Sequence, residues 1–279
     1  MIKSASQLKG KTKNLSGKDA KKAESYVRLF FMERFLERVS VSDFRHNFIL
    51  KGGLLTSSLL GVDLRTTMDI DTTVTAIDLN ENEIRRIVES ICSVEMDDNI
   101  SFEIISMETI MDDFEYPGVR MHLEGHFEGI RQPVKIDVST DDVITPTAIE
   151  YEYRLIFEDR TIKLMSYNTE TLLAEKIQTI LARGIANTRL RDYYDVYMIA
   201  GKAQFDMEIL RQAFSATCNK RNTVFDADQA DRILNLIEND DVLRNNWTKY
   251  GTKYEYARSV EWNDVVSETK SIIQTIVVG

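Results

Sequence analysis

The chain contains 279 residues, enough for one large domain or two smaller ones with proper hydrophobic cores. No apolar stretch approaches the ~20 residues that cross a bilayer, and the first residues form no signal-peptide pattern, so we expect a cytoplasmic protein without membrane contact. The net charge of −10 argues against sequence-blind coating of nucleic acid, which needs a basic domain. Cys92 and Cys218 lie outside any metal-binding spacing, which fits a reducing compartment.

The charge is unevenly distributed along the chain. Residues 1–22 contain one acidic residue, Asp19, and seven lysines: Lys3, Lys9, Lys11, Lys13, Lys18, Lys21 and Lys22. This segment is either a solvated, partly frayed N-terminus or a local patch that contacts phosphates on an otherwise acidic protein.

The first half of the chain alternates between helical and strand-like patterns. Apolar residues at helical spacing predict a helix over 19–41 and another over 80–92. Between them, the apolar run 47–50 predicts a strand that ends at two glycines, followed by a helix that stops near Gly61. Residues 66–74 are rich in β-branched side chains and predict a further strand.

The later segments change character near residue 165. Short alternating runs predict strands over 100–106, 120–127 and 134–138, and one further strand or hairpin arm over 155–164. Beyond them, helical spacing predicts five helices, over 169–182, 191–200, 207–217, 227–239 and 265–277. We therefore expect an α+β chain, with a small mixed sheet in a domain of residues 1–165 and a helical domain of residues 166–279.

The first candidate for chemistry is Lys51-Gly52-Gly53, between a predicted strand and a predicted helix. Glycines let the backbone approach a phosphate closely, and a helix N-terminus offers unpaired N–H groups with a partial positive charge. A pair of glycines alone most often marks a simple turn. The segment therefore gains weight only from its neighbours in the sequence.

Asp69-Ile70-Asp71 lies in the strand that follows. Residues i and i+2 of a strand point to the same face, so both carboxylates project into one place while Ile70 points into the core. Two carboxylates so close together repel each other unless a cation is present. A pair of Mg²⁺ ions is the usual partner in phosphoryl and nucleotidyl transfer.

Asp137 supplies a third carboxylate, in the apolar strand-like run Val-Lys-Ile-Asp-Val. An edge strand or a salt bridge would explain an ionised group there. On a strand beside that of Asp69 and Asp71, it would instead be the third metal ligand and a candidate general base. The order of a Gly-Gly turn, a helix, an Asp-x-Asp strand and a later strand Asp resembles the nucleotidyltransferase fold of the DNA polymerase β type.

Four separated motifs, spread over residues 20–200, narrow this resemblance. They are Tyr26–Thr56, Arg65–Asp71, Val134–Asp137, and Glu175-Lys176 with the later Arg191-Asp192-Tyr193-Tyr194-Asp195. Together they resemble the AbiEii/AbiGii toxin family, which includes the MenT toxins. The resemblance implies a toxin of a bacterial toxin–antitoxin or phage-abortive system, with a cognate AbiEi-like antitoxin. Relatives bind or use nucleoside triphosphates (NTPs), GTP among them, and some add nucleotides to the 3′ end of tRNA.

The resemblance also implies roles for individual residues of the first half. Lys51, Gly52 and Gly53 would hold the triphosphate, and Asp69, Asp71 and Asp137 would bind two Mg²⁺ ions. Thr67 matches a position at which the family carries Ser or Thr. Arg65 would hold phosphates or anchor its loop, and a surface salt bridge is an equal alternative.

In the second half, Lys176 matches the functional lysine of the family and would contact the triphosphate as a point charge. Asp192 and Asp195 share a face of the next predicted helix. Asp192 is the better match to the family and would hold Lys176 or a substrate group, whereas Asp195 could be structural.

Two departures from the usual pattern keep other functions open. Gly53 replaces the serine of the Gly-Ser signature, and fifteen residues separate Gly53 from Asp69. The expected activity is Mg²⁺-dependent transfer of a nucleotide to an RNA acceptor, most plausibly tRNA. The alternatives are a toxin that binds GTP or another NTP without transfer, and a kinase-like transfer of the γ-phosphate to a protein hydroxyl.

Overall fold

The computed structural model describes residues 2–61, 67–76, 80–110, 118–140 and 142–278. The chain forms two compact units. The first unit is α/β and consists of Met1–Ser58, Asp63–Asp142 and Ala148–Ser166. The second unit is helical and consists of Tyr167–Gly279 with Leu59–Val62 and Val143–Thr147. Among the described helices, none has the length and apolar character that a membrane span requires.

A mixed sheet forms the centre of the first unit. Its strands are β1 (Phe48–Lys51), β2 (Asp69–Val74), β3 (Ser101–Ile110), β4 (Gly118–Phe127), β5 (Ile130–Thr140), β6 (Ile149–Arg154) and β7 (Thr161–Ser166). The strand order is β3-β4-β5-β2-β1-β7-β6. The pairs β2/β5 and β1/β7 are parallel, and the other neighbours are antiparallel. The predicted α+β class with a mixed sheet is therefore confirmed.

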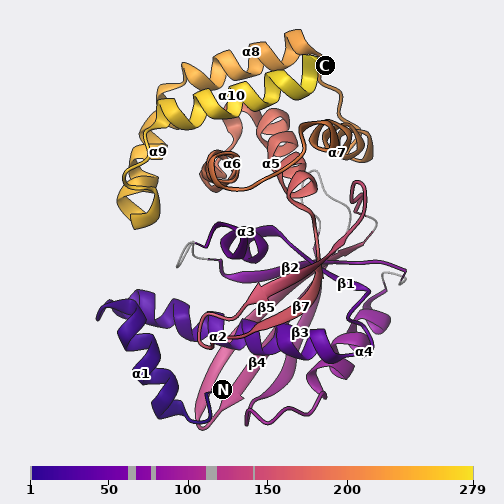
Figure 1. Cartoon of the computed structure of the whole chain (residues 1–279), viewed down its shortest axis with the longest axis vertical. Coiled ribbons are helices and arrows are strands. Elements are labelled where there is room, and N and C mark those ends of the chain that lie inside the picture. Colours follow the sequence, from indigo (N-terminus) through magenta and orange to yellow (C-terminus); the bar gives the residue numbers. More distant parts are fainter. Residues whose placement is uncertain (1, 62–66, 77–79, 111–117, 141, 279) are drawn as a thin grey trace. The chain divides into compact units, whose positions relative to one another are not determined.

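Four helices begin in the first unit: α1 (Ala5–Ser16), α2 (Ala20–Val41), α3 (Gly52–Leu60) and α4 (Glu81–Cys92). The helix α2 contacts β5, β7 and α4, and α4 contacts β3, so these two helices cover one face of the sheet (Figure 1). The helix α1 packs against α2. Side-chain caps start both helices of this pair, because Ser4 accepts a hydrogen bond from the Gln7 N–H and Asp19 accepts two from the first turn of α2.

The central strands alternate between this covered face and an open face. Ile70 of β2 and Ile136 of β5 are fully buried, whereas the residues on either side of each are half-buried. On the covered side, Phe30 of α2 lies 5.8 Å, ring to ring, from Phe127 of β4. The period of two along the strands thus separates an apolar core face from a polar face, on which charged side chains can gather.

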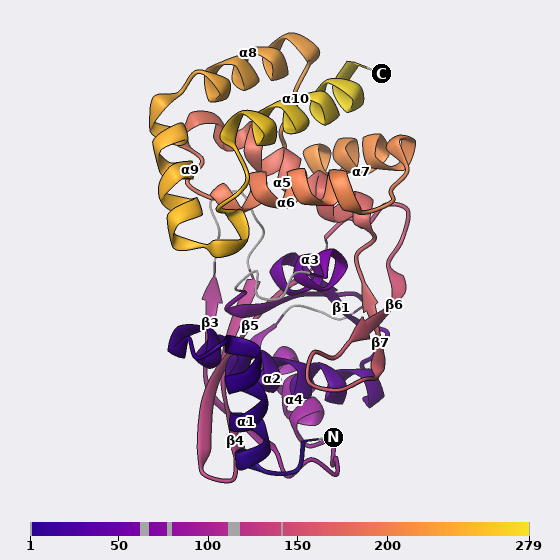
Figure 2. The ribbon, with the colours of Figure 1, turned by 60° about the vertical axis from the view of Figure 1, so that its left-hand side comes forward.

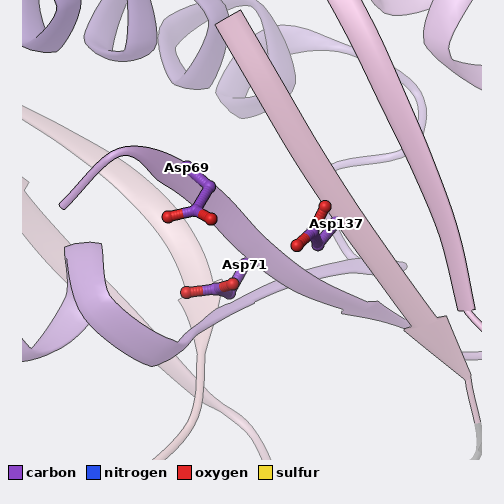
Figure 3. A group of neighbouring side chains, drawn as sticks. All are labelled: Asp69, Asp71 and Asp137. Atoms are coloured by element: carbon purple, nitrogen blue, oxygen red, sulfur yellow. The ribbon is translucent and has the colours of Figure 1, made fainter. Parts of the chain in front are cut away.

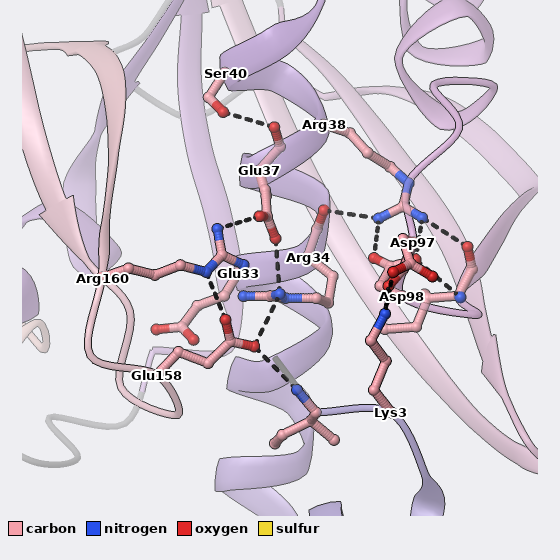
Figure 4. Close-up of polar contacts among 12 residues, drawn as sticks. Lys3, Glu33, Arg34, Glu37, Arg38, Ser40, Asp97, Asp98, Glu158 and Arg160 are labelled. Carbon is pink, nitrogen blue, oxygen red and sulfur yellow. Dashed lines mark hydrogen bonds and ion pairs between the residues drawn. The ribbon is translucent and has the colours of Figure 1, made fainter.

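Seven ionisable residues around α2 form what we call the α2 charge network (Figure 4): Glu33, Arg34, Glu37, Arg38, Asp98, Glu158 and Arg160. Arg38 donates two hydrogen bonds to Asp98, at 2.8 and 2.9 Å, and both side chains are buried. Arg34 pairs with Glu37 at 2.7 Å and with Glu158 at 3.3 Å. Arg160 closes the network through Glu37 and, at 2.5 Å, through Glu158.

Glu33 takes part in the network as a neutral group. Its Oε1 accepts hydrogen bonds from the backbone N–H of Ile156 at 2.9 Å and from the hydroxyl of Tyr153 at 3.5 Å. Burial raises the pKa of Glu33 to about 8, against the opposing effects of the Ile156 N–H and of Arg34. At neutral pH the network therefore sets three carboxylates against three guanidinium groups.

The second unit consists of helices around an aromatic core. Its described helices are α5 (Thr169–Arg183), α6 (Leu190–Lys202), α7 (Met207–Lys220), α8 (Ala227–Glu238), α9 (Asp241–Lys253) and α10 (Trp262–Val278). The helix α5 packs against α6 and α7, and α10 packs against α6, α7 and α8, with α8 and α10 side by side in Figure 2. The Trp262 ring lies 5.3 Å from that of Tyr193 and 5.7 Å from that of Trp247.

Most predicted elements occur within a few residues of their expected bounds, with the following exceptions among the described residues. Residues 5–16 form the capped helix α1, so the interpretation of the N-terminus as partly frayed is wrong. Of the strand or hairpin arm expected over 155–164, residues 161–164 belong to the hairpin arm β7, whereas 155–160 link it to β6, a strand that had no prediction. The helix α9 had no prediction, since its polar sequence shows only a few apolar residues at helical spacing.

Candidate functional site

Three carboxylates gather on the open face of the sheet in the first unit. Asp69 and Asp71 come from β2 and Asp137 from β5, and the parallel register pairs Asp71 with Asp137. One ligand oxygen from each of the three residues lies within 4.8 Å of those of the other two (Figure 3). We call this group the acidic triad. All three side chains are half-buried, so they remain open to a ligand from solution.

The acidic triad is electrostatically strained. Burial, followed by the charge of Asp69, raises the pKa of Asp71 to about 6, and Asp137 adds to the shift. The backbone N–H of Gly53 and the ammonium of Lys51 oppose it. A carboxylate held among like charges in this way gains stability from any cation that binds beside it.

The two glycines bring the start of α3 directly against this site. The N–H of Gly53 donates a hydrogen bond to Oδ2 of Asp71 at 3.0 Å. Gly52 has a φ of +61°, and a Cβ at that position would lie 2.2 Å from the same oxygen. Only glycine therefore permits this approach. The helix N-terminus that was predicted to bind phosphate thus donates a hydrogen bond to a carboxylate of the protein itself, that of Asp71.

Two cations contact the acidic triad that the sequence interpretation did not assign. Arg120 of β4 donates two hydrogen bonds to Asp137, at 2.8 and 2.9 Å. Lys135 of β5 lies 2.5 Å from Asp69 and 3.8 Å from Asp137. Lys135 could have been found, because it stands two residues before Asp137 in a strand and so shares its face. Arg120 lies opposite Asp137 only through the β4/β5 register, which the sequence does not display.

The other residues predicted for the first half lie around β1 and the start of β2. Lys51 makes an ion pair with Asp142, Nζ to Oδ2, at 2.5 Å. The hydroxyl of Thr67 donates to the backbone carbonyl of Asp69 at 3.2 Å and so fixes the chain just before the first carboxylate. Arg65 lies outside the described residues.

In the second unit, Lys176 and Asp192 come together as predicted partners, with a third residue. The Lys176 ammonium lies 3.4 Å from Asp192 and 2.7 Å from Asp195. The side chain of Asp195 is fully buried and that of Lys176 is nearly so. Asp192 and Asp195 stand three residues apart on α6, which places both on the face toward α5. Asp195 is thus the shorter contact, although Asp192 was the residue selected by resemblance.

The donor set of the acidic triad fits divalent magnesium. Carboxylate oxygens are the hard ligands that Mg²⁺ prefers, and the described residues offer no competing thiolate or imidazole within the triad. The close spacing of the oxygens and the raised pKa of Asp71 both favour a bound cation. Arg120 and Lys135 compensate part of the negative charge, and they would give up contacts to a metal ion.

Comparison with known proteins gives the same class of protein. A family model described as "Nucleotidyl transferase AbiEii toxin, Type IV TA system" matches residues 34–268. No curated protein matches the chain. The solved structures that share its fold include a nucleotidyltransferase-type protein from H. pylori (14% identity, 91% of this chain and 95% of that one, TM-score 0.51) and JHP933 from Helicobacter pylori (14% identity, 91% and 92%, TM-score 0.52).

The family match covers most of the chain and includes every described residue of the acidic triad, together with Lys176 and Asp192. The structural likeness, at this low identity, supports the nucleotidyltransferase fold. The chain therefore belongs to the AbiEii family of nucleotidyl transferase toxins of type IV toxin–antitoxin systems.

Proposed function

We propose that this toxin is a Mg²⁺-dependent nucleotidyltransferase that adds the nucleoside monophosphate of an NTP to an RNA acceptor, with the 3′ end of tRNA as the first candidate. The observation that carries the proposal is the clustering of three carboxylates within 4.8 Å on the open face of the sheet. Family membership supports the reaction class, and it supports a cognate antitoxin, AbiEi-like in our proposal, as the partner that restrains the toxin.

Each carboxylate has a part in this reaction. Asp69, Asp71 and Asp137 would hold two Mg²⁺ ions, which supply neutralisation of the charge that builds up around the α-phosphate. Asp137 accepts the proton of the acceptor hydroxyl as that oxygen bonds to the α-phosphorus and pyrophosphate leaves. Gly53 keeps Asp71 in position through its N–H, at 3.0 Å. Lys51, Gly52 and Gly53 bind the triphosphate, and Thr67 fixes the segment before Asp69 through its hydroxyl. For Arg65, which lies outside the described residues, we keep the role that the family resemblance implies, a phosphate contact or an anchor of its loop.

We assign the metal ligands to a domain of residues 1–165. We assign a further group that binds the triphosphate to a domain of residues 166–279. In that second domain, Lys176 binds the triphosphate and Asp192 orients its ammonium, which lies 3.4 Å away. Asp195, at 2.7 Å and fully buried, holds the lysine in place from below the surface. A lysine on a solvent-exposed helix face is rarely buried, so the near burial of Lys176 between two carboxylates argues against a purely solvated role.

The role of Lys176 can be separated from its contribution to stability. Lys176→Ala removes the ammonium that lies 2.7 Å from the fully buried carboxylate of Asp195, whereas Lys176→Gln combined with Asp195→Asn removes both charges together. We expect both variants to abolish growth inhibition in cells, and the double variant to keep the circular dichroism of the wild type. Lys202→Gln, an exposed lysine of the same unit, is the control. A double variant that stays toxic would make Lys176 a structural residue.

One observation favours a second candidate function, the binding of an NTP without transfer. Arg120 and Lys135 already neutralise much of the acidic triad, through contacts of 2.5 to 2.9 Å. A site compensated by its own side chains could hold a triphosphate through these cations without using metal ions for catalysis. This candidate predicts tight nucleotide binding and no change in the RNA.

The experiment that tests the proposal follows the α-phosphate. Purified protein is incubated with Mg²⁺, total RNA and each NTP labelled at the α-position. We expect label in RNA with the wild type and none with Asp69→Ala. Asp43→Ala, which removes an exposed carboxylate of the same unit, is the matched control and should behave as the wild type.

The same experiment separates the alternatives. If the protein binds nucleotide but none of the four NTPs leaves label in RNA, the proposed transfer is wrong and the function is nucleotide binding alone. Label that enters protein from a γ-labelled NTP, and not from the α-labelled one, would support a kinase-like reaction instead.

A further inference from the structure

A groove of about 390 Å³ lies between α1 and the start of α2 in the first unit. Three exposed lysines line it: Lys9 and Lys13 on α1, and Lys18 just beyond the end of that helix. Asp19, Glu24 and Val27 contribute the α2 side. We call this feature the lysine groove. Neither the acidic triad nor the residues of the second unit take part in it.

The lysine groove carries an excess of uncompensated positive charge. Among the described residues, Lys9, Lys13 and Lys18 make no ion pair. Both acidic residues of the lining are already engaged. Asp19 accepts hydrogen bonds from two backbone N–H groups of α2, at 2.8 and 3.0 Å, and Glu24 pairs with Arg28 at 3.4 Å.

The groove is preformed, because α1 is fastened to the rest of the unit. Leu8 of α1 is fully buried. On the other sides of the helix, Lys11 donates a hydrogen bond to the carbonyl of Phe157 at 2.6 Å, and Lys3 pairs with Asp97. Five of the seven lysines in residues 1–22 thus form two sets: Lys3 and Lys11 hold the helix in place, and Lys9, Lys13 and Lys18 line the groove.

The groove also lies near the start of β2, the strand that carries Asp69 and Asp71. Val27 lines the groove, and the next residue of α2, Arg28, contacts the sulfur of Met68. Met68 directly precedes Asp69. Because Met68 shares a strand face with the buried Ile70, Arg28 meets β2 on the face that α2 covers, and an RNA strand in the groove would have to pass the start of β2 to reach the Asp69 carboxylate on the open face.

We propose that the lysine groove binds the phosphate backbone of the RNA acceptor and directs its end toward the acidic triad. This inference rests on the proposed nucleotidyl transfer to RNA. Charge complementarity is the argument for the ligand, because a protein with a net charge of −10 gains affinity for a polyanion only through a local cationic surface. Lys9 and Lys13 stand one helical turn apart, and Lys18 lies beyond the C-cap, so the charges suit a strand of several phosphates.

The test compares two triple variants of the full chain with the same change in net charge. The groove variant carries Lys9→Gln, Lys13→Gln and Lys18→Gln. The control variant carries Lys202→Gln, Lys249→Gln and Lys253→Gln, which are exposed lysines of the second unit. The probe is a fluorescently labelled RNA hairpin with a single-stranded 3′ tail, and its binding is measured by anisotropy over a range of salt concentrations.

For the groove variant, we expect RNA affinity to fall roughly tenfold and the slope of log K against log salt to become shallower by about 2, since each lost phosphate contact contributes about 0.7 for a single strand. The control variant should keep the affinity and slope of the wild type. In the label-transfer assay, the groove variant should show a raised KM for RNA with an unchanged KM for NTP.

Two results would overturn the inference. Equal RNA affinities and slopes for the two triple variants would remove the groove from the RNA surface, even if the wild type transfers label to RNA. Transfer to RNA by the wild type tests the proposed function separately, because it does not depend on the groove. Finally, a labelled polyglutamate that binds as tightly as RNA, and that alone depends on the three lysines, would indicate an acidic protein partner instead.

Discussion

The first unit contains two clusters of charged residues with opposite character, the α2 charge network and the acidic triad. In the network, three arginines face three ionised carboxylates, and the fourth carboxyl, Glu33, is kept neutral by its raised pKa. In the triad, three carboxylates contact two cations, Arg120 and Lys135, and the nearby Lys51 is paired with a further carboxylate, Asp142. The network is balanced within the protein, and the triad is not.

This difference in charge balance indicates which of the two clusters binds a ligand from solution. Both clusters contain good ion pairs, with contacts of 2.5 to 2.9 Å, so the presence of salt bridges does not distinguish them. The two clusters differ in their balance of charge and in their exposure to solvent. The network is buried except at Arg160, whose side chain is 34% exposed, whereas the triad lies half-buried on the open face with an excess of negative charge. An excess of this kind is tolerable when a cation from solution binds there.

The largest expected effect is the loss of activity in Asp71→Asn. We expect nucleotidyl transfer to fall by roughly a thousandfold or more, because a lost metal ligand removes several kcal/mol of charge stabilisation in the transition state. In EDTA, the same variant should gain on the order of 1 kcal/mol in the free energy of unfolding, since it removes a repulsive charge. Transfer assays and urea denaturation measure the two effects, with Asp43→Asn as the control. If Asp71→Asn is instead less stable than the wild type in EDTA, the Asp71 charge is not repulsive in the folded protein, and the triad does not differ from the network in its charge balance.

In the α2 charge network, the loss of a carboxylate should have the opposite effect on stability. Asp98→Asn leaves the buried guanidinium of Arg38 without its counter-charge, and we expect a loss of about 3 to 5 kcal/mol in the free energy of unfolding. The neighbouring Asp97→Asn is the matched control, because Asp97 is exposed and its pair with Lys3 lies on the surface. Urea denaturation of both variants decides the matter. Equal losses of stability at the two positions would mean that burial does not determine how much an ion pair contributes to the free energy of unfolding.

The neutral state of Glu33 predicts a pH dependence of stability. Its pKa rises from an ordinary 4.5 to about 8 on folding, so the folded protein holds a proton that the unfolded chain releases between these values. The stabilisation from this proton is complete below pH 4.5 and is lost as the pH rises through 8. Relative to Glu33→Gln, the wild type should lose on the order of 3 kcal/mol between pH 5 and 8.5. Urea denaturation across this range measures the difference, and a difference that stays constant with pH would show that Glu33 is already ionised.

The smallest of the four effects concerns the cation that competes with a metal ion. Arg120→Gln frees both oxygens of Asp137 from a guanidinium, and we expect the affinity for a divalent ion to rise about tenfold, equivalent to about 1.4 kcal/mol. Binding of Mn²⁺, followed by electron paramagnetic resonance, measures this without any turnover. The control is Arg131→Gln, which removes an exposed cation of β5. If both variants bind Mn²⁺ alike, Arg120 does not occupy the metal site.

Much of the fold was predictable from periodicity, and the parts that were not depend on contacts between distant residues. The alternation of Asp69, Ile70 and Asp71 predicted both the strand β2 and its two faces. The polar helix α9 escaped because its few buried residues, Leu243 and Trp247 among them, give a weak signal, so its place depends on tertiary packing.

The candidate site divides in the same way. The position of Asp137 beside Asp71 agrees with the order of the motifs, and the structure brings the two together through a parallel strand pair. The contact of Arg120 with Asp137 depends on a register that only the folded sheet defines. Asp195 was set aside as structural, and its 2.7 Å contact with Lys176 shows that a buried carboxylate can be the nearer partner of a functional candidate.

The contact of Gly52 with Asp71 also has a genetic consequence. Any side chain at position 52 would collide with the Asp71 carboxylate, at 2.2 Å from its Cβ, and would have to adopt a φ of +61°. Shortening residue 71 to alanine removes the carboxylate but leaves the Cβ of residue 71 at 2.6 Å, together with the backbone strain. Asp71→Ala should therefore not suppress the folding defect of Gly52→Ala. A folded but inactive form of the toxin, for work without its antitoxin, is better obtained by changing Asp71 alone.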